Sequence, residues 1–204
     1  MRRVSILFSS SIIALALVYA RPQPGRVADP SVKASLSDED KKAIDTFLQS
    51  AKAYLDIEKN APSQAKLKKS DDVAESEARR HALKQIIRKT RASAKQGDLF
   101  TPAAADLFRR LITNALTGPD GAAARRSLLH AEPGTAAEAK LVKVNGTFPN
   151  HKGQPLQSAP ATLLQQLPML PKGLEYRMLG NMLVLRDTEA NLVVDYLPEA
   201  VKQG

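Results

Sequence analysis

Histidine, cysteine and serine carry much of the metal and nucleophilic chemistry of proteins, and this chain of 204 residues offers few of them in a useful spacing. It has no Cys, which excludes thiol catalysis, disulfides, Cys-ligated zinc and iron–sulfur centres. Its three His, at His81, His130 and His151, form no i, i+4 pair, whereas zinc needs three or four convergent ligands. We therefore predict no metal site and no cofactor.

The nucleophile and calcium motifs in the chain are incomplete. Ser63 to Lys66 matches the Ser-x-x-Lys string of penicillin-binding enzymes, but the Ser-Asp-Asn and Lys-Thr-Gly companions are missing. The segment from Asp187 begins like a calcium loop, but Leu192 and Pro198 stand where the loop requires Gly and Glu. No catalytic residue is predicted, and a hydrolase whose site assembles only on folding stays open as an alternative.

The most unusual feature is the run of residues 79–95, which holds seven Lys or Arg and no acid. On a helix, five of these cations form one stripe, which we expect on the side opposite Leu83, Ile86 and Ile87. The stripe consists of Arg80, Lys84, Arg88, Arg91 and Lys95. A stripe of this kind suits an acidic envelope protein or an anionic envelope surface. The other interpretation is the solvated outer face of a bundle helix.

The overall charge is also basic, with a formal net charge of +9. Nucleic acid is nevertheless not predicted as a partner. No aromatic residue lies between Tyr54 and Phe100, so the basic run lacks the stacking rings typical of single-strand binding.

The first twenty residues have the layout of a cleaved secretory signal. Arg2 and Arg3 precede an uncharged, mostly apolar run over 4–18, and cleavage is expected near Ala20. The apolar run is shorter than the roughly 20 residues that a spanning helix needs. We therefore expect a periplasmic or secreted protein with no transmembrane span after cleavage.

Capping residues and helical spacing divide the rest of the chain. We predict a signal peptide over 1–20, a flexible linker over 21–36, a helical module over 37–132, a linker over 133–139 and a small α+β module over 140–200. The helical module contains four expected helices. They run from Ser37 to the Ala61-Pro62 pair, from Ser70 to Gly97, from Thr101 to Gly118, and from Asp120 to Leu129.

The last module has the spacing of strands. We expect a strand over 141–144, a short helix over 161–167 and a three-stranded meander whose turns lie at Gly180-Asn181 and over 188–191. Pairing residue 179 with 182, and 187 with 192, places Tyr176, Leu185 and Val194 on one face. The other face then carries two solvated pairs, Glu175–Arg186 and Arg177–Asp195. The expected fold class is α+β, a small helical bundle followed by a small antiparallel β-meander.

Several strings resemble an uncharacterised group of exported bacterial proteins. They are Gly97 to Pro102, Phe108 to Arg110, Gly118 to Gly121, Leu167 to Pro171, Leu174 to Arg177, Gly180, Val184 to Asp187 and Ala190 to Asp195. The resemblance implies export and a bacterial source, and it implies no activity. The meander is also similar to small periplasmic proteins of nickel and cobalt homeostasis, which keeps metal homeostasis as a further alternative. We expect a non-enzymatic periplasmic or envelope interaction protein.

Overall fold

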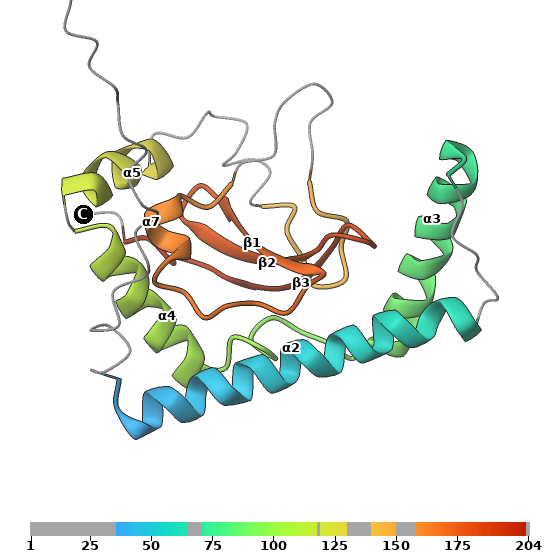
Figure 1. Ribbon diagram of the computed structural model, residues 1–204, viewed down its shortest axis with the longest axis horizontal. Helices are drawn as coiled ribbons and strands as arrows, with labels where there is room; N and C mark the ends of the chain where they lie inside the picture. The colour runs from blue at the N-terminus through green and yellow to red at the C-terminus, as the bar shows by residue number, and fades with distance from the viewer. Residues whose placement is uncertain (1–35, 65–70, 118, 130–139, 150–157, 203–204) are drawn as a thin grey trace, which may run out of the picture.

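The computed structural model describes residues 36–64, 71–117, 119–129, 140–149 and 158–202, and it has an α+β fold (Figure 1). The expected signal peptide, nearly all of the first linker and the second linker lie outside these ranges. Within them, no helix is long and apolar enough to cross a membrane. The helices are α2 (Asp38–Gln64), α3 (Val73–Thr90), α4 (Pro102–Ala115), α5 (Pro119–Leu129) and α7 (Ala161–Leu164). The strands are β1 (Leu174–Leu179), β2 (Met182–Asp187) and β3 (Leu192–Leu197).

Side-chain caps start three of the helices, two of them where the sequence predicts; α3 begins at Val73, later than predicted, because Asp72 is its cap and does not lie in its first turn. The Ser37 hydroxyl accepts from the N–H of Asp40 at 3.1 Å, and Asp72 accepts from the N–H of Glu75 at 3.0 Å. Thr101 caps α4 directly before a proline at the first helical position. The predicted end of α2 at Ala61-Pro62 is wrong, because the helix continues to Gln64. A proline this close to a helix end removes only one bond of the ladder.

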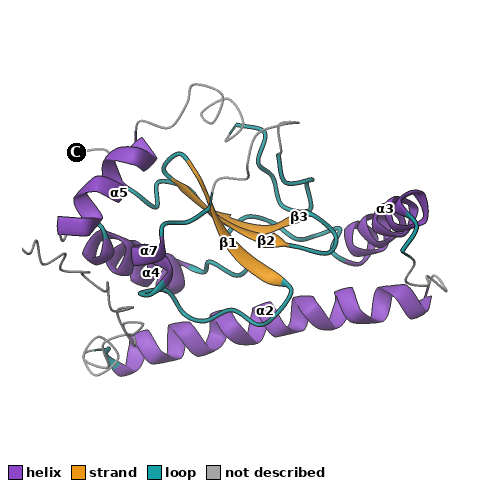
Figure 2. Ribbon diagram, turned by 45° about the horizontal axis from the view of Figure 1, so that its top comes forward, coloured by secondary structure: helices purple, strands orange, loops and turns teal. Residues whose placement is uncertain are grey.

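An aromatic cluster joins the helices to the sheet. The Phe47 ring of α2 lies 4.9 Å from the Phe108 ring of α4 and 5.2 Å from the Phe100 ring. The Phe108 ring in turn lies 6.0 Å from the ring of Tyr176 on β1. These rings belong to a hydrophobic cluster that contains residues of α2, α3, α4 and all three strands. The long α2 therefore lies across one face of the sheet, with α3 near its C-terminal end (Figures 1 and 2).

The sheet is an antiparallel meander in the order β1-β2-β3. Leu179 pairs with Met182 and Tyr176 with Leu185, which confirms the predicted register of the first hairpin. Gly180 at its turn has a φ of 58°, a left-handed conformation that glycine adopts without steric cost. The second hairpin also begins as predicted, with Asp187 opposite Leu192.

Farther along the second hairpin the predicted register is wrong. Arg186 pairs with Val193 but Leu185 pairs with Asp195, so a β-bulge at Val194 shifts the remaining pairs by one residue. Asp195 is consequently fully buried, and the predicted solvated pair between Arg177 and Asp195 does not form. Arg177 instead binds Glu175 on its own strand, with N–O distances of 2.7 and 2.8 Å.

The second face of the sheet is covered where the sequence analysis expects it to be solvated. Val142 and Phe148 pack on this face. The predicted strand over 141–144 is wrong, because these residues form turns and irregular structure. An isolated bridge follows at Thr147, which pairs with Leu192. The predicted ion pair between Glu175 and Arg186 is present, but it lies largely buried under this segment. The Arg186 guanidinium sits 5.4 Å from the centre of the Phe148 ring.

Candidate partner-binding surface

The basic run begins on α3, whose two ends carry opposite charges. Asp72 caps the helix and Glu75 lies in its first turn, whereas Arg88 and Lys89 lie in its last turn. This distribution matches the helix dipole, which favours anions at the N-terminus and cations at the C-terminus. Leu83 and Ile87 are fully buried and anchor the helix in the core.

The helix is shorter than the sequence predicts, and this shortens the predicted stripe. α3 ends at Thr90 with Arg91 as its C-cap, although the prediction extended it to Gly97. A turn follows, in which the N–H of Lys95 donates to the Asp98 carboxylate at 2.9 Å. Lys95 is exposed and lies outside the helix, so it does not extend the row formed by the other four cations.

The stripe also lies on a different side of α3 from the one predicted. At roughly 100° per residue, Arg80 and Arg91 are within about 40° of buried Ile87 around the helix axis. The cations therefore flank the core-facing side of α3 instead of lying opposite it. This position brings several of them within reach of the sheet and its connecting loops.

Arg88 and Arg91 use this position to hold the segment that covers the second face of the sheet. Arg88 Nε donates to the Asn145 carbonyl at 2.9 Å, and Arg91 Nη1 donates to Asn145 Oδ1 at 2.9 Å. Asn145 returns a bond from its amide to the Arg91 carbonyl at 2.8 Å, and it has a left-handed φ of 61°. Arg91 also donates to the carbonyl of Val194, the bulge residue, at 3.2 Å. These two arginines are bound within the chain.

Two more cations of α3 contact the turn between β2 and β3. Arg79, which is outside the predicted stripe, forms an ion pair with the Glu189 carboxylate. Arg80 donates through Nε to the Glu189 carbonyl at 3.2 Å, and its side chain remains exposed. The turn therefore neutralises Arg79 and leaves the charge of Arg80 facing solvent.

Lys84 differs from its arginine neighbours because it has no hydrogen-bond or ion-pair partner among the described residues, whereas Arg80 and Arg88 bind neutral acceptors. It is half-buried and lies between Arg80 and Arg88, one helical turn from each. Burial lowers the pKa of Lys84, and the charges of Arg80 and Arg88 lower it further. In the described part of the chain, no carboxylate forms an ion pair with Lys84. Arg80, Lys84 and Arg88, called here the cation row, therefore form a positive patch in which none of the three makes an ion pair with a described residue.

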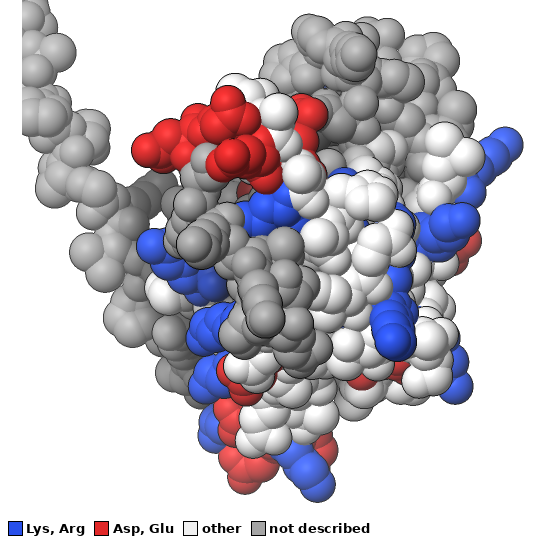
Figure 3. Space-filling model, turned by 90° about the vertical axis from the view of Figure 1, so that its right-hand side faces the viewer, with Lys and Arg blue, Asp and Glu red and all other residues white. Residues whose placement is uncertain are grey.

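The face that carries the cation row is mixed in sign. Figure 3 shows acidic side chains gathered at the upper end of this face, where α3 begins, and Lys and Arg side chains below them. The acids that flank the start of the helix are Asp71, Asp72, Glu75 and Glu77. A partner that fits this face needs negative charge opposite the cation row and little or none opposite the start of α3.

A buried polar cluster beneath α3 was missed by the sequence analysis. Tyr54 of α2 donates its hydroxyl proton to Asp187 at 2.6 Å, and the Arg91 guanidinium lies 4.9 Å from the Tyr54 ring centre. Burial raises the pKa of Tyr54 and also that of Asp187. Tyr54 and Asp187 are 133 positions apart, so no local motif connects them.

The fully buried acids Asp187 and Asp195 accept their hydrogen bonds from groups of the chain itself. Asp187 also accepts from the N–H groups of Glu189 and Ala190, both at 2.8 Å. Asp195 accepts from four backbone N–H groups, and burial raises its pKa although these donors oppose the shift. Both carboxylates thus tie loops to the sheet.

The structure assembles no group of three or more potential metal ligands from the residues it describes. His81 is exposed on α3, while His130 and His151 lie outside the described ranges. Comparisons with models of known protein families, with curated proteins and with solved structures find no match to this chain. Its function must therefore be inferred from its own surfaces.

Proposed function

We propose that the chain is a non-enzymatic protein of the bacterial envelope, exported by its first twenty residues, that binds an acidic protein partner through the cation row of α3. The observation that carries this proposal is the environment of Lys84. Burial lowers the pKa of Lys84, the charges of the two arginines beside it lower that pKa further, and no described carboxylate pairs with Lys84. An acidic side chain of a partner supplies the missing counter-charge.

The mixed charge of this face favours a protein partner over an anionic lipid surface. A membrane presents negative charge across its whole area, and it repels the acidic start of α3 while it attracts the cation row. A protein surface places charges of both signs at defined positions and so complements both ends of the helix. The two large apolar side chains nearest the row, Leu83 and Ile87, are buried in the core and do not insert into lipid.

The test is a charge reversal on each side of the same helix. Lys84→Glu places an acid inside the cation row. Lys89→Glu makes the same change at an exposed residue about 140° away around the helix axis, and it serves as the matched control. The probe is a fluorescent peptide of alternating Glu and Ala, and its binding is followed by anisotropy at low salt. Vesicles of phosphatidylglycerol provide the lipid arm.

We expect the Lys84→Glu variant to bind the acidic peptide about tenfold more weakly than wild type, because one attraction is lost and one repulsion is added. The Lys89→Glu variant should bind within about twofold of wild type, and 0.5 M salt should abolish the difference. Equal losses in both variants would mean that only net charge matters. Strong binding to vesicles without binding to the peptide would overturn the proposal of a protein partner.

A further inference from the structure

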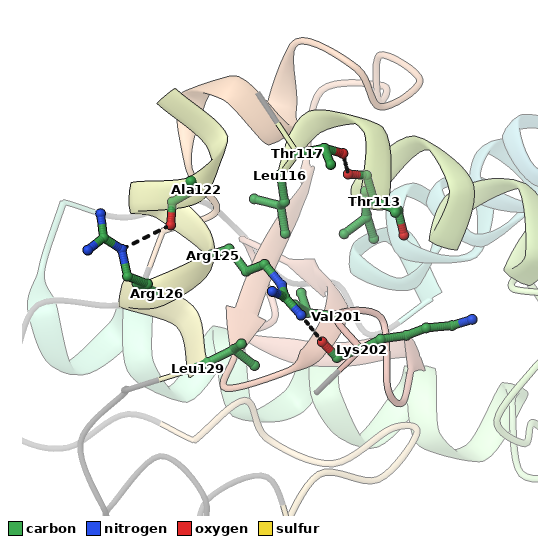
Figure 4. A pocket seen from close by; sticks show the side chains of 10 residues that line it. Thr113, Leu116, Thr117, Ala122, Arg125, Arg126, Leu129, Val201 and Lys202 are labelled. Carbon is green, nitrogen blue, oxygen red and sulfur yellow. Dashed lines mark hydrogen bonds between the residues drawn. The ribbon is translucent and has the colours of Figure 1, made fainter. Parts of the chain in front are cut away.

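A second candidate site lies at the opposite end of the molecule from α3, in a groove between α4, α5 and the C-terminal segment (Figure 4). The groove has a volume of about 420 Å³, which is within the range of small-molecule sites. Its walls are mainly apolar. The apolar lining residues are Ile112, Leu116, Ala122, Leu129 and Val201.

Close packing at a glycine fixes the shape of the groove. A Cβ on Gly121 would lie 2.3 Å from the Ala115 carbonyl oxygen and 2.7 Å from backbone atoms of Leu116, so α5 approaches the end of α4 at a distance that only glycine permits. The third wall is held to the sheet, because the N–H of Val201 donates to the Asn181 carbonyl at 3.1 Å. The groove is thus built on fixed elements.

One cation is directed into the groove. The Arg125 side chain points from α5 toward Val201, and its Nη2 donates to the Lys202 carbonyl at 2.9 Å (Figure 4). The next residue, Arg126, also borders the groove, but its guanidinium turns the other way and donates to the Ala122 carbonyl of its own helix. A guanidinium has five N–H donors, and the bond to Lys202 uses one of them. No carboxylate is among the residues that line the groove.

We propose that this groove binds a single-chain anionic amphiphile of the fatty carboxylate class. The apolar walls contact the alkyl chain, and the unused N–H groups of Arg125 donate to the carboxylate in the paired geometry that arginine favours. Lys202, exposed at the edge of the groove, adds a second positive charge. The site is independent of the cation row on α3, so either proposal stands if the other fails.

Calorimetric titration of the purified chain with decanoate, below its micelle concentration, tests the proposal. Octanoate and decanol are the comparison ligands, because the first shortens the chain and the second removes the charge. The key variant is Arg125→Gln. Arg80→Gln is its matched control, since it removes the same charge from an exposed residue of α3 that does not line the groove. Ala122→Trp fills the groove from an exposed position and leaves both arginines in place.

We expect decanoate to bind with one-to-one stoichiometry and about 15-fold more tightly than octanoate, because it has two more methylenes and each buried methylene contributes roughly fourfold in affinity. Arg125→Gln and decanol should each weaken binding by about tenfold or more, and Ala122→Trp should abolish it. Arg80→Gln should leave the affinity within about twofold of wild type. Absence of saturable binding to the wild-type chain, equal affinity for decanol, or equal losses in the two arginine variants would each overturn the proposal.

Discussion

Replacing Asp195 with asparagine should destabilise the fold by about 2–4 kcal/mol, although the side chain changes by a single atom. One carboxylate oxygen accepts from the N–H groups of Gly97 and Tyr196, at 3.0 and 2.8 Å. The other accepts from those of Leu99 and Phe100, both at 2.8 Å. Asp195 is fully buried, so no water can replace a lost acceptor.

The magnitude follows from counting acceptors. An asparagine keeps one oxygen and so retains one of the two pairs of donors, while its amide N–H₂ group faces the other pair. Each buried N–H that loses its acceptor costs about 1–3 kcal/mol. The lower cost of burying a neutral amide instead of a carboxylate offsets part of this loss. The net loss of unfolding free energy for Asp195→Asn is then about 2–4 kcal/mol.

Equilibrium unfolding in urea, read at constant m-value, measures this free energy. The matched control is Asp98→Asn, because the Asp98 carboxylate in the same loop accepts one exposed N–H, that of Lys95. We expect Asp98→Asn to lower the free energy of unfolding by no more than about 1 kcal/mol. If the two variants unfold at the same urea concentration, the four donors do not hold the loop to β3.

Two further perturbations test other parts of the structure. Gly121→Ala should lower the free energy of unfolding by about 1–3 kcal/mol, because the new Cβ meets backbone atoms at the end of α4. Helix propensity alone predicts a gain in stability. Urea unfolding measures this free energy, and a stabilised variant would contradict the close packing at Gly121. The Arg110 hydrogen bond lowers the pKa of Asp40, so that interaction stabilises the fold above a pH of about 3.8 and is lost as the pH falls through the lower folded value. Arg110→Gln should therefore destabilise the chain near neutral pH and match wild type in strong acid; a loss that persists in acid would contradict the linkage.

The parts of the fold that could be predicted are those whose cause is local in the sequence. A cap such as Thr101 acts on an N–H three residues away, and the first hairpin pairs Leu179 with Met182 across a two-residue turn. The amphipathic spacing of α4 also predicts its buried face, because that helix packs on one side only. In each case the deciding interaction lies within one or two turns of chain.

The bulge at Val194 could not be predicted in this way. Residues 192–195 of β3 are all buried, since the strand is covered on both faces, and alternation therefore does not say which way Asp195 points. The donors that bind Asp195 come mainly from residues 97–100, almost a hundred positions earlier. The partners of the α3 arginines are also remote in sequence, since Asn145 lies 57 positions from Arg88 and Glu189 lies 109 positions from Arg80. The sequence therefore predicts the basic run but not the contacts that its arginines make within the chain.

The stability of a Lys84 variant distinguishes a structural role of the cation row from a role in binding. Like charges one helical turn apart destabilise a helix, and Lys84 has such a neighbour on each side. A glutamate at this position would pair with Arg80 and Arg88, so Lys84→Glu should raise the free energy of unfolding by about 0.5–1 kcal/mol while it weakens binding of the acidic peptide. A purely structural role for the row predicts the opposite change in stability. A gain in stability with a loss of binding is the pattern expected where a surface keeps an unfavourable arrangement of charges for a partner.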